Sequence, residues 1–228
     1  MIVSINQPAY LPWLGYFARI AASDLHIVLD HVQFEKNSMV NRNKIRTKDG
    51  WSWLTVPIQT KGRFGQLPIQ SMEVDNLQPW ERKHLNALRT NYARASHFAA
   101  HEPFFTAVYS EQWQQFAPLA RKITDYMLKT LEIRTPLLFS SDMNITRGKS
   151  ELVLDLCRAA CATVYLSGPF GRDYLDEAAF CEAGIEVRYH DFHHPSYRQV
   201  FDGFEPYMSA IDLLFNYGPE SRNVIFSK

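Results

Sequence analysis

The sequence predicts an α/β fold in which a mostly parallel sheet is flanked by helices, with a β-hairpin and a helical lobe inserted into it. A strand, a helix and a second strand fit into the first 30 residues. The same alternation returns between residues 136 and 189, whereas the chain between carries a hairpin signal and then helical patterns. Alternating strands and helices favour a parallel sheet, because parallel neighbours need a crossover connection.

The N-terminal unit begins with an apolar run at residues 1–5, which is typical of a buried strand and is closed by Gln7 and Pro8. A helix is expected at 12–22 and a second strand at 26–30. A strand–helix–strand crossover of this kind is right-handed in nearly all proteins.

The central chain carries a hairpin and then three helices. Lys48-Asp49-Gly50 is a strong turn signal, and it separates two arms rich in β-forming residues, at 40–46 and 51–58. A further strand is expected at 68–74, and Pro79 is typical of a first helical turn. The helices are expected at 79–95, 104–116 and 118–131.

The C-terminal chain returns to alternating strands and helices. Strands are expected at 136–139, 163–166 and 185–189, helices at 149–161 and 174–183, and a last helix at 209–215. We therefore expect a single domain over residues 1–228, with an inserted lobe at about 36–132.

Composition narrows the function classes. The 228 residues hold 24 basic and 24 acidic side chains, so net charge gives no reason to expect extended nucleic-acid binding. Three cysteines are too few for a disulfide framework, and no apolar run approaches the ~20 residues of a membrane span. The N-terminus has no basic leader. These features predict a soluble, cytoplasmic protein without membrane insertion.

The carboxyl ends of the predicted strands are all polar. Ligands of parallel α/β folds bind beyond these ends, so a small-molecule site is expected there, although connecting loops are polar in general. The polar ends are Asn6, Gln7, Asp30, residues 140–142, Ser167, Gly168, His190 and Asp191.

The loop at 7–17 is the first candidate for binding. Tyr10 and Trp13 are large aromatic residues in a turn stiffened by two prolines, and Gly15 allows a close approach to the helix backbone. The alternative is a turn that only packs the lobe onto the sheet.

The stretch at 30–46 is the second candidate, because amides alternate there with cations. Gln33, Asn41, Arg42 and Lys44 belong to it, and Arg42 is a natural bidentate partner for phosphate or carboxylate. The alternative is a solvated hairpin face.

Two C-terminal segments are weaker candidates. The turn at 167–174 contains glycines and Arg172, which suit a phosphate at a helix start. The run 190–194 contains three histidines and an aspartate, but no second ligand cluster accompanies it, so we predict no metal site. His190 fits a general base better.

Motifs in these same segments carry a family resemblance. The first are Gln7-Pro8-x-Tyr10-Leu11-Pro12-Trp13-x-Gly15-Tyr16-Phe17, Asp30-x-Val32-Gln33-Phe34, Asn41-Arg42-Asn43-Lys44-Ile45 and Trp53-Leu54-Thr55-Val56-Pro57. The later ones are Leu166-Ser167-Gly168-x-x-Gly171-x-x-Tyr174-Leu175, Tyr197-x-Gln199 and Ser209-x-x-Asp212-Leu213-Leu214-Phe215-Asn216. In order, and over nearly the whole chain, they resemble the WbqC-like proteins of bacterial O-antigen and other surface-polysaccharide gene clusters.

The resemblance implies a function in the synthesis of surface polysaccharide, such as the O-antigen of lipopolysaccharide. Some members are described as glycyl or acyl transferases that act on amino sugars. The N-terminal unit also resembles Rossmann-like domains of the nucleotidylyltransferase type, whose His-x-Gly-His motif is replaced here by Pro12-Trp13-Leu14-Gly15-Tyr16. The missing histidines argue against adenylate chemistry.

We therefore expect a transferase that moves an aminoacyl or acyl group, such as glycyl, onto a nucleotide-linked amino sugar. Asp30 or His190 would take the proton from the attacking amine. The substrate-binding residues would be Asn6, Gln7, Tyr10, Trp13, Gln33, Asn41, Arg42, Lys44, Trp53, Ser167, Gly168 and Arg172.

The acyl donor system stays open between ATP, coenzyme A and aminoacyl-tRNA. Two alternatives to the transferase also stay open: a nucleotidylyltransferase-like enzyme that uses ATP, and a non-catalytic module that binds a nucleotide sugar. The oligomeric state is not predicted.

Overall fold

A five-stranded parallel sheet organises the computed structural model, which describes residues 1–63, 65–146 and 148–226. The strands lie in the order β5-β2-β1-β6-β7, and every neighbouring pair is parallel. Their bounds are Ile2–Asn6 (β1), Leu25–Val28 (β2), Leu137–Phe139 (β5), Val164–Ser167 (β6) and Glu186–Tyr189 (β7). The expected α/β fold with a Rossmann-like parallel sheet is confirmed.

The chain winds the sheet in two directions from β1. It first adds β2 and β5 on one side, and then crosses back to add β6 and β7 on the other side. The crossovers of the first half therefore cover one face, and those of the second half cover the opposite face. The direction of winding reverses between β1 and β6.

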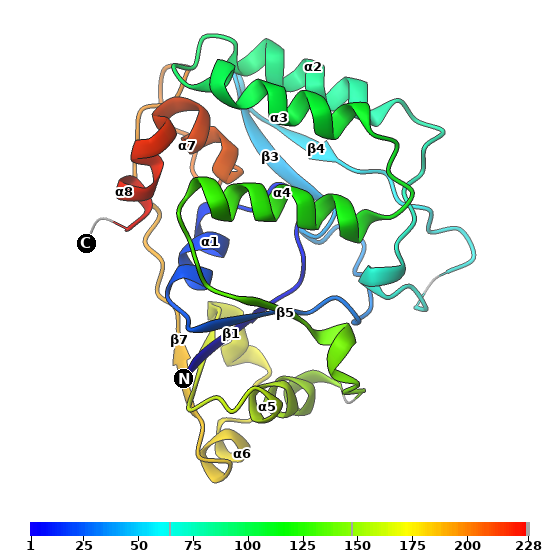
Figure 1. Ribbon diagram of the computed structural model, residues 1–228, viewed down its shortest axis with the longest axis vertical. Coiled ribbons are helices and arrows are strands. Elements are labelled where there is room, and N and C mark those ends of the chain that lie inside the picture. The colour runs from blue at the N-terminus through cyan, green and yellow to red at the C-terminus, as the bar shows by residue number, and fades with distance from the viewer. Residues whose placement is uncertain (64, 147, 227–228) are drawn as a thin grey trace.

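Helices cover both faces of the sheet (Figure 1). Helices α1 (Leu14–Ala21) and α4 (Phe116–Thr130) lie on one face, and α5 (Lys149–Ala159) and α6 (Glu177–Glu182) on the other. The α5 and α6 side has its own core, in which Ile27, Leu156 and Phe180 are fully buried.

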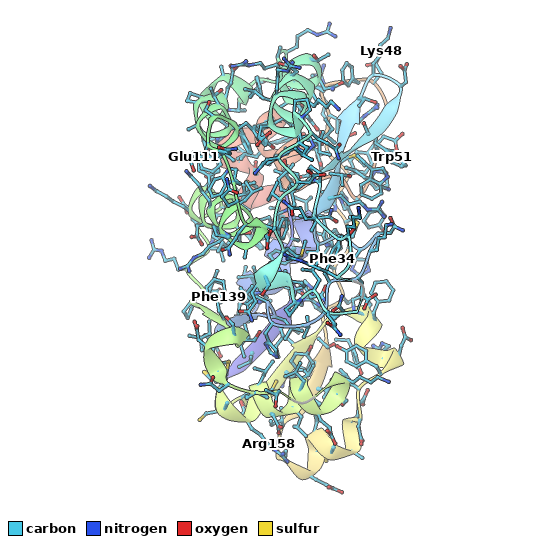
Figure 2. The ribbon with its side chains drawn as sticks, turned by 90° about the vertical axis from the view of Figure 1, so that its right-hand side faces the viewer. Phe34, Lys48, Trp51, Glu111, Phe139 and Arg158 are labelled. Carbon is cyan, nitrogen blue, oxygen red and sulfur yellow. The ribbon has the colours of Figure 1, made fainter. Side chains whose placement is uncertain are left out.

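The inserted lobe lies beyond α1 and α4. It contains the antiparallel hairpin β3 (Arg42–Thr47) and β4 (Gly50–Thr55), with α2 (Trp80–Tyr92) and α3 (Phe98–Ser110) above it. The C-terminal helices α7 (Ala210–Tyr217) and α8 (Ser221–Phe226) pack beside them. Figure 2 shows the hairpin, with Lys48 at its tip, on one edge of the molecule. One continuous core joins these elements to α1 and α4.

Two predicted elements differ from the structure. The strand expected at 68–74 is wrong: Ile69–Ser71 form a short 3₁₀ helix, and single bridges replace a ladder. Ile69 and Met72 are both buried and stand three residues apart, a spacing that period 2 does not produce. The helix expected at 104–116 begins six residues earlier, because Pro103 is accommodated inside it.

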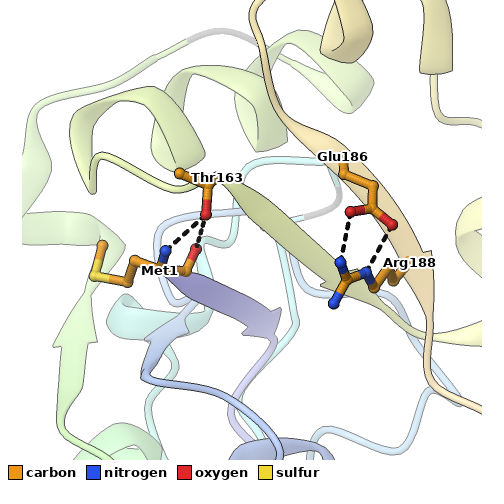
Figure 3. A network of polar contacts seen from close by, with 4 residues as sticks. All are labelled: Met1, Thr163, Glu186 and Arg188. Atoms are coloured by element: carbon orange, nitrogen blue, oxygen red, sulfur yellow. Dashed lines mark hydrogen bonds and ion pairs between the residues drawn. The ribbon is translucent and has the colours of Figure 1, made fainter.

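The ends of β1 and the edge strand β7 are secured by polar contacts (Figure 3). The amino group of Met1 donates to Thr163 Oγ1 over 2.6 Å, next to β6. On β7, Arg188 donates twice to Glu186, over 2.6 and 2.7 Å. Exposed charges on an edge strand disfavour pairing with another chain.

No helix within the described residues combines the length and the apolar character that crossing a membrane requires.

Candidate functional site

A cavity of about 620 Å³ lies where the winding of the sheet reverses, beyond the carboxyl ends of β1 and β6. In open α/β sheets this reversal point is the usual place for a ligand. The polar and aromatic side chains that line it include Asn6, Gln7, Trp13, Tyr16, Arg19, Ser167, Phe170, Tyr174, His190 and Phe192.

Arg19 is the residue of this cavity that the sequence analysis missed. It lies on α1 and lines the cavity, and no ion pair joins it to an acidic side chain within the described residues. Its Nε is buried and has no hydrogen-bond partner among these residues. Burial lowers its pKa, but a guanidinium still keeps its proton at neutral pH. The cavity therefore contains a cation that forms no ion pair within the described residues, although the exposed carboxylate of Asp191 also lines this cavity.

Gly168 explains how the guanidinium fits. A Cβ atom at Gly168 would lie 2.1 Å from an Arg19 terminal nitrogen, so a larger residue there would displace the guanidinium from its place beside the loop that follows β6. Gly171 has a similar place, because a Cβ there would meet the Ser167 hydroxyl. These glycines allow close packing of the loop, whereas the sequence had suggested a tight turn that holds a phosphate.

The groups around Arg19 are neutral. Burial raises the pKa of Tyr16 and of Tyr165 well above the usual phenol range, so neither supplies a negative charge. The Nδ2 atom of Asn6 is buried at the cavity and has no hydrogen-bond partner among the described residues. Buried polar groups without partners are costly, so both donors favour an acceptor at this wall of the cavity.

His190 also lines the cavity, directly after β7. Its backbone N–H donates to the Ser167 carbonyl over 2.8 Å, and its ring lies nearly parallel to Phe192 with centroids 6.1 Å apart. Burial, and then the charge of Arg19, lowers the pKa of His190. The imidazole is therefore neutral at pH 7 and is able to accept a proton.

Trp13 forms an aromatic wall of the cavity. Its ring contacts Phe192 and Tyr207 at centroid distances of 5.5 and 5.8 Å. A Cβ at Gly15 would lie 2.3 Å from the indole, so the close approach that Gly15 allows is occupied by Trp13 itself. This packing leaves the expected backbone contact between Gly15 and a ligand without support.

Asp30 lies outside this cavity and does not meet His190 in it. Its carboxylate accepts hydrogen bonds from the Ser140 hydroxyl and from the backbone and hydroxyl of Ser141, over 2.8–3.0 Å. It is buried, and these three hydrogen bonds join the ends of β2 and β5, which gives Asp30 a structural role.

Tyr10 is fully buried and offers no ring face to a substrate. Its hydroxyl bonds to Tyr109 and to His84 Nδ1, over 2.5 and 2.8 Å. Tyr10 therefore joins the loop after β1 to α2 and α3. This agrees with the alternative that the turn packs the lobe onto the sheet.

The remaining candidates are spread over other places. Gln33 bonds to the backbone of Phe34 and Leu67, and Asn41 donates to the backbone carbonyl of Val56 beyond β4. Arg42, Lys44 and Trp53 share the outer face of the hairpin, and Arg172 stacks on Tyr189 outside the cavity. Asn6, Gln7, Trp13, Ser167, Gly168 and His190 are thus the predicted residues that the cavity brings together.

Metal ligation finds no geometric support in the part of the chain that is described. No group of three or more His, Cys, Asp or Glu side chains is placed there to hold an ion. Asp191 and His193 are highly exposed and stand 3.9 Å apart.

The C-terminal motifs that contain Gln199 and Asp212 stabilise the fold. The Asp212 carboxylate is buried and accepts hydrogen bonds from Tyr92, Tyr197 and Gln199 over 2.8–2.9 Å. Gln199 in turn accepts from Arg46, whose other nitrogens donate to backbone carbonyls. This network holds α7 against the hairpin.

Comparison with known proteins shows which family the sequence belongs to. The chain is 41% identical over 225 residues to a Mycobacterium tuberculosis protein named "Uncharacterized protein Rv1507c", with 98% of this chain and 96% of the relative covered. No solved structure matches significantly. Residues 7–224 match the model of a family described as "WbqC-like protein family". The chain therefore belongs to the WbqC-like family.

Proposed function

We propose that the cavity between β1 and β6 binds a nucleotide-linked amino sugar, and that the protein transfers an acyl or aminoacyl group to its amine. The product would enter the synthesis of bacterial surface polysaccharide. The observation that carries the proposal is Arg19, a half-buried cation that forms no ion pair within the described residues, at the reversal point of a Rossmann-like sheet.

The chemistry of the cavity matches the parts of such a substrate. A guanidinium binds phosphate oxygens bidentately, so Arg19 suits the diphosphate. The Asn6 amide donates beside it, and Trp13 with Phe192 offers ring faces to a base or a sugar. Arg19 therefore takes the role in diphosphate binding that the sequence had suggested for Arg42, Lys44 and Arg172.

His190 is the proposed general base. The neutral amine of the sugar attacks the acyl carbon, a nitrogen–carbon bond forms, and the bond from the acyl carbon to the leaving group breaks. The proton of the amine passes to the imidazole of His190, whose lowered pKa keeps it unprotonated beforehand. General-base assistance of this kind contributes about 10²–10⁴-fold.

One assay identifies the acyl donor and distinguishes the transferase from the binding module and the nucleotidylyltransferase-like enzyme. UDP- and dTDP-linked amino sugars are incubated with an amino acid plus ATP and Mg²⁺, with an acyl-coenzyme A, or with a charged tRNA, and mass spectrometry follows the sugar. We expect one donor to give an amide, and His190→Gln to lower the rate at least ~100-fold. His193→Gln, an exposed neighbour, is the control and should leave the rate unchanged.

Two other results would contradict the transferase. Binding of a nucleotide sugar without product from any donor favours the binding module. Release of pyrophosphate from ATP without any change to the sugar favours the nucleotidylyltransferase-like enzyme.

A further inference from the structure

The hairpin has one buried face and one open face. Asn43, Ile45 and Leu54 point into the core, whereas the residues between them alternate to the other side. The open side carries Arg42, Lys44, Trp51 and Trp53, which we call the indole–cation face. It is separate from the cavity, whose lining stops at Met39 and Val40, just before β3 begins.

Cations and indoles alternate on this face. The Arg42 guanidinium lies 4.4 Å from the centroid of Trp53, and the Lys44 ammonium lies 4.2 Å from Trp51 and 5.5 Å from Trp53. Trp51 is 44% exposed, which is unusual for so large an apolar side chain. Figure 2 labels Trp51 beside the hairpin and Lys48 at its tip.

Positive charge is concentrated here, although the whole chain is neutral. Residues 36–48 contain five basic side chains and no acidic one, against 24 of each in the full sequence. Arg46 is enclosed by backbone carbonyls, but Lys36 and Lys48 are exposed, and Lys44 is half-exposed. The net charge therefore conceals a local patch that attracts anions.

We propose that the indole–cation face binds single-stranded RNA. Each nucleotide carries one ring and one phosphate, which matches one indole and one cation per repeat on this face. Alternate residues of a strand stand about 6.8 Å apart, a repeat that suits an extended single strand. Aromatic platforms between cations bind single strands without sequence preference, whereas a duplex hides its ring faces.

This inference rests on residues other than those of the proposed function. If it holds, the single-stranded 3′ end of a charged tRNA becomes the favoured acyl donor, because β3 begins next to residues that line the cavity.

The test is fluorescence anisotropy of a labelled ten-nucleotide RNA of mixed sequence, titrated with the full chain at several salt concentrations. We expect salt-dependent binding, and Trp51→Ala should weaken it about tenfold or more, as removal of a stacking ring does. Lys44→Gln should reduce the slope of log K against log salt by about 0.7, the contribution of one phosphate contact on a single strand.

Control variants distinguish RNA binding at the indole–cation face from binding in the cavity and from non-specific binding of polyanions. Arg172→Gln removes an exposed arginine that also stacks on an aromatic ring, and Arg19→Met removes the cavity cation; both should bind the RNA as the native chain does. No binding, equal binding of duplex RNA, or equal binding of heparin with no effect of Trp51→Ala would each overturn the proposal.

Discussion

The hydrogen-bond partners of individual side chains distinguish residues that stabilise the fold from residues that are available to a ligand. Asp212 and Arg46 are buried, but each is surrounded by hydrogen-bond partners. Asp30 likewise accepts three hydrogen bonds. Arg19 has the opposite character, since its Nε is buried without a partner among the described residues. An unpaired buried charge is a cost in the free protein, and it indicates a site.

Buried histidines make the fold sensitive to acid. Burial lowers the pKa of His26 to about 3 and that of His84 to about 4. The unfolded chain takes up these protons near pH 6.5 and the folded chain does not, so the stability they confer is complete above pH 6.5 and declines as the pH falls toward 4. Each group contributes a slope of about 1.4 kcal/mol per pH unit in that window.

His84→Gln tests this acid sensitivity. Urea unfolding between pH 6 and 4.5 should show a slope of free energy against pH that is lower by about 1.4 kcal/mol per unit than in the native chain. His193→Gln, at a highly exposed position, should leave the slope unaltered. An unaltered slope for His84→Gln as well would show that His84 titrates normally.

At the scale of elements, the loop after β6 and the helix α1 form the site together. Gly168 admits the Arg19 guanidinium, so a methyl group there must displace it. We expect Gly168→Ala to abolish the thermal shift that a nucleotide sugar causes, while the protein still folds. Gly148→Ala is the matched control, because a Cβ at Gly148 meets no atom within 4 Å. Retained ligand shift in Gly168→Ala would mean that Arg19 does not contact the ligand.

The sequence predicted the strands of the sheet well and the site only in part. Short apolar runs between helices carry a clear pattern, and the carboxyl ends of β1 and β6 follow from it. Arg19 was missed because a single arginine on an amphipathic helix is normally solvated, and only the tertiary fold shows that it is half-buried and lines the cavity. Tyr10 was misjudged for the converse reason: an aromatic residue in a loop does not reveal that α2 and α3 enclose it.

In the molecule as a whole, one hydrophobic core packs against each face of the sheet. The α5 and α6 core lies on one side, and the larger core with the inserted lobe on the other. All five tryptophans belong to the lobe and its neighbours, at residues 13, 51, 53, 80 and 113. Their fluorescence therefore reports on one side of the sheet only, and this asymmetry allows a test of the single predicted domain.

Phe180→Ala creates a cavity in the α5 and α6 core, far along the chain from every tryptophan. It should cost about 3–5 kcal/mol, or roughly 10 °C in Tm for a chain of this length. If the chain is one domain, tryptophan fluorescence and far-ultraviolet circular dichroism should show the same lowered midpoint. A fluorescence midpoint that stays at the native value would reveal two independent units.

We expect Arg19 to bind the anionic part of a nucleotide sugar, and a thermal-shift titration measures this binding. UDP- and dTDP-linked amino sugars are titrated into the native chain, Arg19→Met and Arg172→Gln. At 100 times its Kd a ligand stabilises the fold by about 2.7 kcal/mol, or roughly 5–10 °C here.

The account predicts this rise for the native chain and for Arg172→Gln. Arg19→Met should show no rise, and its ligand-free Tm should equal or exceed the native value because an unpaired buried charge is removed. A native chain that responds to no nucleotide sugar, or an Arg19→Met variant that responds as the native chain does, would contradict it.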